Sequence, residues 1–172
     1  MKNVLIFGNS GSGKSTLAQA LSAQEGLQHL DLDSVAWQAE SPPQRKPLAE
    51  SEYDIDAFRD RFKAWVIEGC YADLLELLLP HASEIVFMDL PTSVCIENAR
   101  SRPWEPHKYP SKTAQDANLP MLEAWIADYE TREDVFSKRA HEALYNSFKG
   151  PKRTVFENRT DLKDSFFARD AG

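Results

Sequence analysis

The most specific chemical pattern in the sequence lies near its N-terminus. The segment Gly8–Ser15 reads GNSGSGKS and fits GxxxxGK[ST] in full, after a short apolar run and before a stretch with helical periodicity. Glycines let the backbone wrap closely around an anion, so that successive N–H groups and the start of the next helix point at phosphate oxygens. The pattern therefore predicts a loop that binds the phosphates of a nucleoside triphosphate, which we expect to be ATP with Mg²⁺.

The side chains of this loop have separate expected roles. Lys14 supplies a mobile positive charge to the β- and γ-phosphates during transfer, and the Ser15 hydroxyl is the expected Mg²⁺ ligand. A glycine-rich turn with a chance lysine is the alternative, which the strand-like and helix-like flanks do not favour. The expected nucleotide contacts are Gly8, Asn9, Ser10, Gly11, Ser12, Gly13, Lys14, Ser15 and Thr16.

Acidic residues follow three of the apolar runs. Asp31 and Asp33 stand two apart at the expected end of a strand, so their side chains point to the same side. Because ligands bind at the carboxyl ends of parallel strands, Asp31 is a candidate for holding Mg²⁺ through water, and Asp33 for accepting a proton from a substrate hydroxyl. The alternative is that both aspartates cap the following segment. Asp89 is a further candidate for the Mg²⁺ shell, and Glu68 is a rival catalytic base and a candidate substrate contact.

Positive side chains further along the chain are candidates for neutralising charge on the transferred phosphoryl group. Arg100 and Arg102 stand where a long polar stretch begins, and Arg132 stands on a predicted helix after it. Lys108 and Lys112 lie within the stretch. For each of these residues, the alternative is an ordinary solvated charge on the surface.

Hydrophobic periodicity predicts the elements that position these residues, and alternating strands and helices imply a mostly parallel sheet covered on both faces. The predicted strands are 4–7, 27–32, 65–67, 84–90 and 153–156. The predicted helices are 14–25, 54–64, 74–79, 94–100, a long periodic segment over 122–148, and 161–169. Trp125 and Tyr129 are expected in the core, whereas Trp37 is placed to stack on a planar acceptor. The stretches 38–53 and 101–120 are long loops in this plan, and such loops often act as lids or binding segments.

Composition limits the class of protein. With 172 residues the chain suits one domain, and its net charge of −7 argues against a sequence-independent grip on nucleic acid. No apolar run approaches the roughly 20 residues of a membrane helix, and the N-terminus does not read as a signal peptide. Cys70 and Cys95 show no metal-ligand spacing, which favours two reduced thiols in a cytoplasmic protein.

Taken together, the motifs resemble the adenylate-kinase and shikimate-kinase group of P-loop kinases. Within it they are most similar to the adenylate-kinase-related proteins of the topology-modulation or flagellar-regulator type. The motifs that carry the resemblance are the phosphate loop, Leu32-Asp33 with a nearby Trp37, the proline-rich loop 42–47 with Arg45, the segment WVIEGCY at 65–71, and Asp89-Leu90-Pro91. The resemblance implies one domain over residues 1–172 with a five-stranded parallel sheet in the order 2-3-1-4-5. It also implies an acceptor-binding segment at about 34–64 and a lid at about 101–120.

The same resemblance implies further site residues. Arg45 and Arg59 stand where related kinases bind the acceptor, and Arg159 follows the fifth strand, where they hold adenine. The chain departs from shikimate kinases in having Glu68-Gly69-Cys70 in place of a glycine triplet. We therefore expect a monomeric kinase whose acceptor is a nucleotide, a nucleoside or a small hydroxylated metabolite. A regulatory P-loop NTPase and a nucleotide-binding module without turnover are the alternatives.

Overall fold

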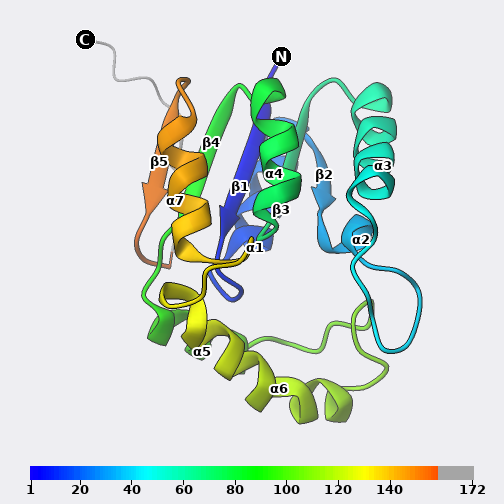
Figure 1. Cartoon of the computed structure of the whole chain (residues 1–172), viewed down its shortest axis with the longest axis vertical. Coiled ribbons are helices and arrows are strands. Elements are labelled where there is room, and N and C mark those ends of the chain that lie inside the picture. The colour runs from blue at the N-terminus through cyan, green and yellow to red at the C-terminus, as the bar shows by residue number, and fades with distance from the viewer. Residues whose placement is uncertain (159–172) are drawn as a thin grey trace.

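The computed structural model describes residues 1–158, in which five parallel strands form one sheet (Figure 1). The strands are β1 (Asn3–Gly8), β2 (Gln28–Asp31), β3 (Trp65–Gly69), β4 (Glu84–Met88) and β5 (Lys152–Val155). Their order across the sheet is β2-β3-β1-β4-β5, and every pairing is parallel. The predicted α/β fold and strand order are therefore confirmed.

Helices cover both faces of this sheet. They are α1 (Lys14–Glu25), α2 (Asp33–Ala36), α3 (Leu48–Arg61), α4 (Ala72–Leu78), α5 (Thr92–Arg100), α6 (Lys112–Ala127) and α7 (Lys138–Ser147), with 3₁₀ turns at Leu79–His81 and Asp128–Glu130. In Figure 1, α4 and α7 lie in front of the sheet and α1 lies behind it. The helix α6 and the chain before it run across the end of the sheet toward which the strand arrows point (Figure 1).

The central strand β1 explains why the core has two halves. Val4, Leu5, Ile6 and Phe7 are all fully buried. Because successive side chains of a strand point to opposite faces, Leu5 and Phe7 join the core under α4 and α7, whereas Val4 and Ile6 join the core under α1, α5 and α6. Burial on both faces holds β1 rigid, and the phosphate loop begins at its last residue.

Two predicted loops are shorter than expected because helices begin inside them. Helix α3 begins at Leu48, directly after Pro47, and not at Asp54. The Ser51 hydroxyl, which is fully buried, donates to the Val35 carbonyl and ties this added turn to α2. The predicted start of the helix at Asp54 was therefore wrong, since the apolar positions after Asp54 mark only its second half.

The stretch 101–120 was predicted as a loop, but only residues 101–111 lie outside a helix. The Ser111 hydroxyl accepts a hydrogen bond from the Ala114 N–H and caps α6, which then runs through Pro120. The long periodic segment 122–148 is also interrupted, because α6 ends at Ala127 and α7 begins only at Lys138, capped by Ser137. The predicted helix 161–169 lies outside the described residues.

None of the helices within residues 1–158 combines the length and the apolar character that crossing a membrane requires.

Candidate functional site

A cavity of about 1490 Å³ opens at the carboxyl ends of the strands, where ligands bind in open parallel sheets. Its walls come from the phosphate loop, the ends of β2 and β3, the chain after α5, and α6. At one end, toward β5, it is lined by Asn98, Val155 and Asn158; at the other, toward β2, by Asp33 and Trp37. A site for one small ligand typically measures about 300–1,000 Å³. The cavity is thus large enough for two reactants with the phosphate loop between them.

The phosphate loop is held in shape by contacts from two helices. The Asn9 side-chain amide donates to the Ile126 carbonyl over 3.1 Å, and the Asn98 amide donates to the Gly11 carbonyl over 2.8 Å. Gly11 and Gly13 have positive φ angles of 76° and 87°, which side-chain-bearing residues rarely adopt. The predicted contacts from Ser10 to Thr16 line the cavity, whereas Gly8 and Asn9 lie outside its lining.

Lys14 and Ser15 start α1 and point into an acidic environment. Lys14 Nζ donates to the Asn9 carbonyl over 2.6 Å, so the ammonium folds back over its own loop. The Ser15 hydroxyl donates to Glu68 Oε1 over 2.7 Å, and His29 Nε2 lies 3.3 Å from the same oxygen. Glu68 is 1 % exposed. These contacts hold the proposed Mg²⁺ ligand Ser15 close to the end of β3.

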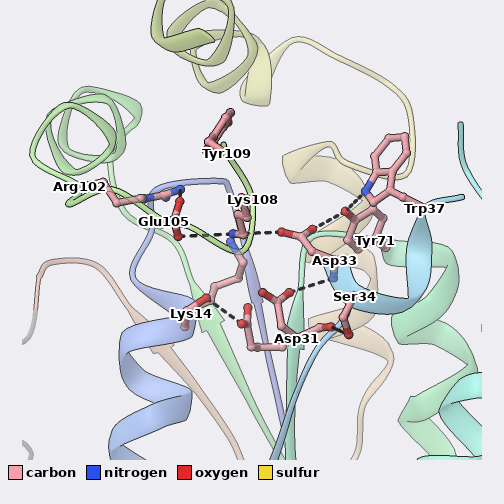
Figure 2. A network of polar contacts seen from close by, with 12 residues as sticks. Lys14, Asp31, Asp33, Ser34, Trp37, Tyr71, Arg102, Glu105, Lys108 and Tyr109 are labelled. Carbon is pink, nitrogen blue, oxygen red and sulfur yellow. Dashed lines mark hydrogen bonds and ion pairs between the residues drawn. The ribbon is translucent and has the colours of Figure 1, made fainter. Parts of the chain in front are cut away.

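Asp31 lies beside this cluster at the end of β2, and it accepts hydrogen bonds from the first two residues of α2. Its Oδ1 accepts the backbone N–H of Asp33 over 2.9 Å, and its carbonyl accepts the Ser34 hydroxyl (Figure 2). Burial, the charge of Glu68 and the charge of Asp33 together raise the pKa of Asp31 to about 6. The N-cap residue of α2 is Leu32, so Asp31 does not cap the helix in the predicted sense, and its side chain lines the cavity.

Asp33 is oriented by three side chains from three segments (Figure 2). The Tyr71 hydroxyl donates to Asp33 Oδ1, and Trp37 Nε1 donates to the Tyr71 oxygen over 2.7 Å. Lys108 Nζ lies 3.3 Å from the other carboxylate oxygen. Burial and the charge of Asp33 raise the pKa of Tyr71, so this hydroxyl remains a donor. Asp33 is thus a fixed carboxylate at the mouth of the cavity.

The segment 101–111, which we call the lid loop, brings two cations over the cavity. Lys108 and Arg102 both lie near Glu105, at 3.6 and 3.5 Å. Burial opposes protonation of Lys108, but the carboxylates of Asp33 and Glu105 outweigh it and raise its pKa. The Glu105 N–H donates to the side chain of Gln115 over 2.9 Å, which fastens the loop to α6. Within residues 1–158, no three His, Cys, Asp or Glu side chains cluster as a metal site, so a bound Mg²⁺ would rely on Ser15, phosphate oxygens and water.

The structure brings only part of the predicted set together around the cavity. Asp31, Asp33, Trp37, Glu68 and Arg102 line it. Besides Gly8 and Asn9, the predicted residues that do not line it are Arg45, Arg59, Asp89, Arg100, Lys112 and Arg132. Arg159 falls outside the described residues.

The predicted charged residues outside the cavity lining are held by ion pairs. Arg100 lies 2.7 Å from Glu123, Asp89 lies 3.4 Å from Lys138, and Arg59 lies 2.8 Å from Asp56. Arg45 lies 3.1 Å from Asp73, and Arg132 lies 2.8 Å from Asp134. Each would have to leave a neighbouring charge to contact a phosphate.

Among the cavity residues, Tyr71 and Asn98 were missed by sequence reasoning and Trp125 was placed elsewhere. Tyr71 ends the segment WVIEGCY, and that motif was the available signal for it. Asn98 has no motif, yet it joins the phosphate loop to Asn158 through amide hydrogen bonds of 2.8 Å. Trp125 was expected in the core, but it is 37 % exposed and lines the cavity, whereas Tyr129 is buried as expected.

A buried histidine supports the turn that presents Tyr71. His141 is fully buried; Nε2 donates to the Cys70 carbonyl over 2.8 Å, and Nδ1 then accepts from the Tyr129 hydroxyl over 2.7 Å. Burial lowers the pKa of His141 to about 4 from 6.5. The ring is therefore neutral in the folded protein at neutral pH.

This shift predicts a loss of stability in mild acid. Between pH 6.5 and 4 the unfolded chain protonates His141 and the folded chain does not. The contribution of His141 to the free energy of unfolding is therefore complete above pH 6.5 and is lost as the pH falls toward 4. The loss is about 3 kcal/mol. Asp31, whose pKa is raised, acts with the opposite sign between pH 4 and 6. Urea unfolding of the wild type and of His141→Gln should therefore be compared: their difference in unfolding free energy should narrow as pH falls, and a constant difference would contradict the prediction.

Comparison with known proteins agrees with this geometry at the level of the fold. The shikimate kinase of Bacteroides thetaiotaomicron has 16 % identity and a TM-score of 0.51, with 95 % of this chain and 90 % of that chain covered. The deoxyadenosine kinase of M. mycoides, solved with bound dATP, has 12 % identity and a TM-score of 0.50, with 90 % of each chain covered. At such identities the likeness shows a P-loop kinase-like fold.

Two comparisons of sequence found matches, and the family match covers the part of the chain that contains the phosphate loop. The uncharacterized protein YqaC of Bacillus subtilis is 29 % identical over 109 residues, which are 60 % of this chain and 58 % of that protein. The chain thus spans less than two thirds of this relative. Residues 4–118 match the family model described as AAA domain, AAA_18, and this match includes the phosphate loop, the acidic cluster and the lid loop. The chain therefore belongs to this family of P-loop, nucleotide-binding domains.

Proposed function

We propose that the protein transfers the γ-phosphate of Mg-ATP to a hydroxyl group of a small acceptor. The observation that carries this proposal is the shared cavity: the phosphate loop and the carboxylate of Asp33 line the same space, beneath two cations of the lid loop. A kinase needs its phosphate-binding loop and a base for the acceptor hydroxyl in the same site, and this site must be able to close over the reactants. The kinase-like fold, and the resemblance to adenylate-kinase-related proteins, support the same conclusion.

The proposed roles follow from the positions of the side chains. Lys14 and the backbone of the phosphate loop bind the β- and γ-phosphates. Bound Mg²⁺ would neutralise phosphate charge, held by Ser15 and, through water, by Asp31. The acceptor oxygen bonds to the γ-phosphorus as the bond to the β–γ bridging oxygen breaks. Asp33 takes the hydroxyl proton, and ADP leaves.

The remaining predicted residues have proposed roles that depend on movement. Arg102 and Lys108 of the lid loop would neutralise charge on the transferred phosphoryl group. Arg100 and Arg132 would join them only by leaving Glu123 and Asp134. Similarly, Arg45, Arg59 and Asp89 would reach a ligand only after their present ion pairs open. A base contact by Arg159 is a separate proposal.

The first test is ADP release from Mg-ATP in the presence of a panel of acceptors. The panel contains nucleosides, nucleoside monophosphates, shikimate and small sugar acids, and Lys14→Ala is the background control. Lys14-dependent stimulation by one acceptor class would support the proposal. Basal hydrolysis that depends on Lys14, but that no acceptor stimulates, would move the assignment to an NTPase with a regulatory role.

Asp31 predicts the acidic limb of the pH profile. Its carboxylate can hold the water shell of Mg²⁺ only when ionised, and in the free enzyme its pKa is about 6. We therefore expect kcat/KM for Mg-ATP to fall about tenfold per pH unit below pH 6 in the wild type. The variant Asp31→Asn should be slower and should lack this inflection. An unchanged inflection in the variant would assign the titration to another group.

A further inference from the structure

The cavity has an aromatic wall at the end where Asp33 lies. The rings of Trp37, Tyr71, Phe136 and Trp125 all line the cavity and follow one another edge to face. Their successive centroids lie 6.3, 5.3 and 5.2 Å apart. The series starts at Trp37, which donates a hydrogen bond to the Tyr71 oxygen, and the Tyr71 hydroxyl in turn donates to Asp33. A hydroxyl-bearing molecule next to Asp33 would therefore have flat apolar surface beside it.

The wall is braced by two arginines that do not line the cavity. The Arg132 guanidinium lies 3.4 Å from the centroid of the Trp125 ring, and that of Arg45 lies 4.8 Å from the centroid of the Tyr71 ring. Such stacking fixes the orientation of the rings. Trp37 and Trp125 nevertheless keep 38 % and 37 % of their surface exposed. Exposed indole rings held in place on the wall of a cavity are a surface for stacking a planar group.

The charged side chains that line the cavity do not favour an anionic acceptor, and the two arginines behind the wall are paired with Asp73 and Asp134. Among residues 1–158, the Lys and Arg side chains that line the cavity are Lys14, Arg102 and Lys108. Lys14 belongs to the phosphate loop, Arg102 pairs with Glu105, and Lys108 lies between Glu105 and Asp33. The acidic residues that line it are Asp31, Asp33, Glu68 and Glu105. A phosphate or carboxylate on the acceptor would meet a surplus of negative charge and would compete with ATP for the lid cations.

The order of the strands separates this wall from the nucleotide end. The phosphate loop follows the central strand β1; β4 and β5 lie to one side and β3 and β2 to the other. Asn98, Val155 and Asn158 line the β5 end, whereas Asp33 and Tyr71 stand after β2 and β3. Two reactants that meet at the phosphate loop therefore have distinct places, and the aromatic wall belongs to the acceptor.

We infer that the acceptor is an uncharged molecule with a planar ring and a free hydroxyl group, of the nucleoside class, and not a nucleoside monophosphate or a carboxylate. This inference rests on the proposed kinase activity and narrows it. In the transfer, the hydroxyl of the nucleoside bonds to the γ-phosphorus of ATP and its proton passes to Asp33. The products are ADP and a nucleoside monophosphate, which carries the charge that the wall and the acidic cluster disfavour, so charge would assist release.

The test measures transfer from Mg-ATP to adenosine, guanosine, cytidine and thymidine, each beside its 5′-monophosphate, with shikimate and glycerol as non-planar acceptors. At least one nucleoside should exceed its own monophosphate in kcat/KM by tenfold or more. The variant Trp125→Leu should raise the KM for that nucleoside about tenfold or more and leave the KM for ATP unchanged. The control is Phe156→Leu, which removes a ring that is 64 % exposed and outside the cavity lining; it should change neither KM.

A second variant tests the charge argument directly. Glu105→Gln removes the carboxylate with which both lid cations pair, so the ratio of kcat/KM for nucleoside to that for monophosphate should fall several-fold. Titration calorimetry of the same acceptors into protein loaded with a non-hydrolysable ATP analogue gives the affinities without turnover. Preference for a monophosphate, shikimate or glycerol would overturn this inference and leave the kinase proposal standing. ATP hydrolysis that depends on Lys14, with neither transfer to nor binding of any acceptor, would overturn both.

Discussion

Replacing Asp33 by asparagine is expected to lower the kcat of phosphoryl transfer by about 10²- to 10⁴-fold, the usual contribution of a positioned general base. The change removes the charge and the proton-accepting capacity but keeps the shape. The asparagine oxygen is still able to accept the Tyr71 hydroxyl, so the local structure should persist. The Kd for ATP should stay within about threefold of the wild-type value, because Asp33 lies at the acceptor end of the cavity. Steady-state kinetics with the best acceptor and titration of an ATP analogue measure the two quantities.

Two further variants make this result interpretable. Asp54→Asn removes an equally simple carboxylate from the surface of α3, outside the cavity lining, and should leave kcat unchanged. Glu68→Gln tests the rival base. The Glu68 carboxylate accepts a hydrogen bond from Ser15 and contacts His29, so loss of its charge should affect Mg-ATP binding more than proton transfer. If Asp33→Asn kept nearly full kcat while Glu68→Gln lost it, the base would be Glu68.

The parts of the site that the sequence predicts well are those governed by backbone rules. The phosphate loop needs glycines at fixed spacing between a buried strand and a helix, and a short segment of the sequence contains this whole pattern. The Asp31–Asp33 pair is also local, since residues two apart at a strand end share a side. The alternation of predicted strands and helices implies a parallel sheet, and the resemblance to known kinases implies its strand order. These features therefore appear in the structure at the predicted places.

What the sequence does not predict is which charges pair with one another. Arg100 and Arg132 look alike in sequence to Arg102, yet each lies beside an acidic partner and outside the cavity lining, Glu123 and Asp134 respectively. Lys108 is one of two lysines in the polar stretch, and only the fold of the lid loop brings it to Asp33. Such pairings depend on tertiary contacts over many residues, and no local pattern records them.

Helix faces were misread for a related reason. Trp125 fits the apolar periodicity of a buried helix, but α6 packs against α5 and the phosphate loop through other side chains, including Ile126, which is fully buried. Trp125 consequently turns its ring toward Phe136 and the cavity. Periodicity gives the direction of an apolar face but not what lies opposite it, which for Trp125 is the Arg132 guanidinium, the Phe136 ring and the cavity.

The second large effect concerns Gly11, where a single methyl group should damage both stability and nucleotide binding. Gly11 has φ of 76°, and a Cβ placed there would collide with the Cys95 carbonyl oxygen in α5. Gly11→Ala is expected to lower the unfolding free energy by about 1–2 kcal/mol for the left-handed backbone and by about 1–3 kcal/mol more for the collision. The shift would also strain the hydrogen bond from Asn98 to the Gly11 carbonyl.

The matched control is Gly26→Ala at the end of α1. Gly26 has a similar φ of 69°, but no atom lies within 4 Å of the position that its Cβ would take. It should therefore lose only the backbone contribution, about 1–2 kcal/mol, and bind the ATP analogue with unchanged affinity. For Gly11→Ala, we expect Kd to rise about tenfold or more, equivalent to about 1.4 kcal/mol or more. Urea unfolding and analogue titration of the two variants separate these contributions. Equal losses at both positions would show that α5 yields freely, and that the phosphate loop does not depend on its contact with this helix.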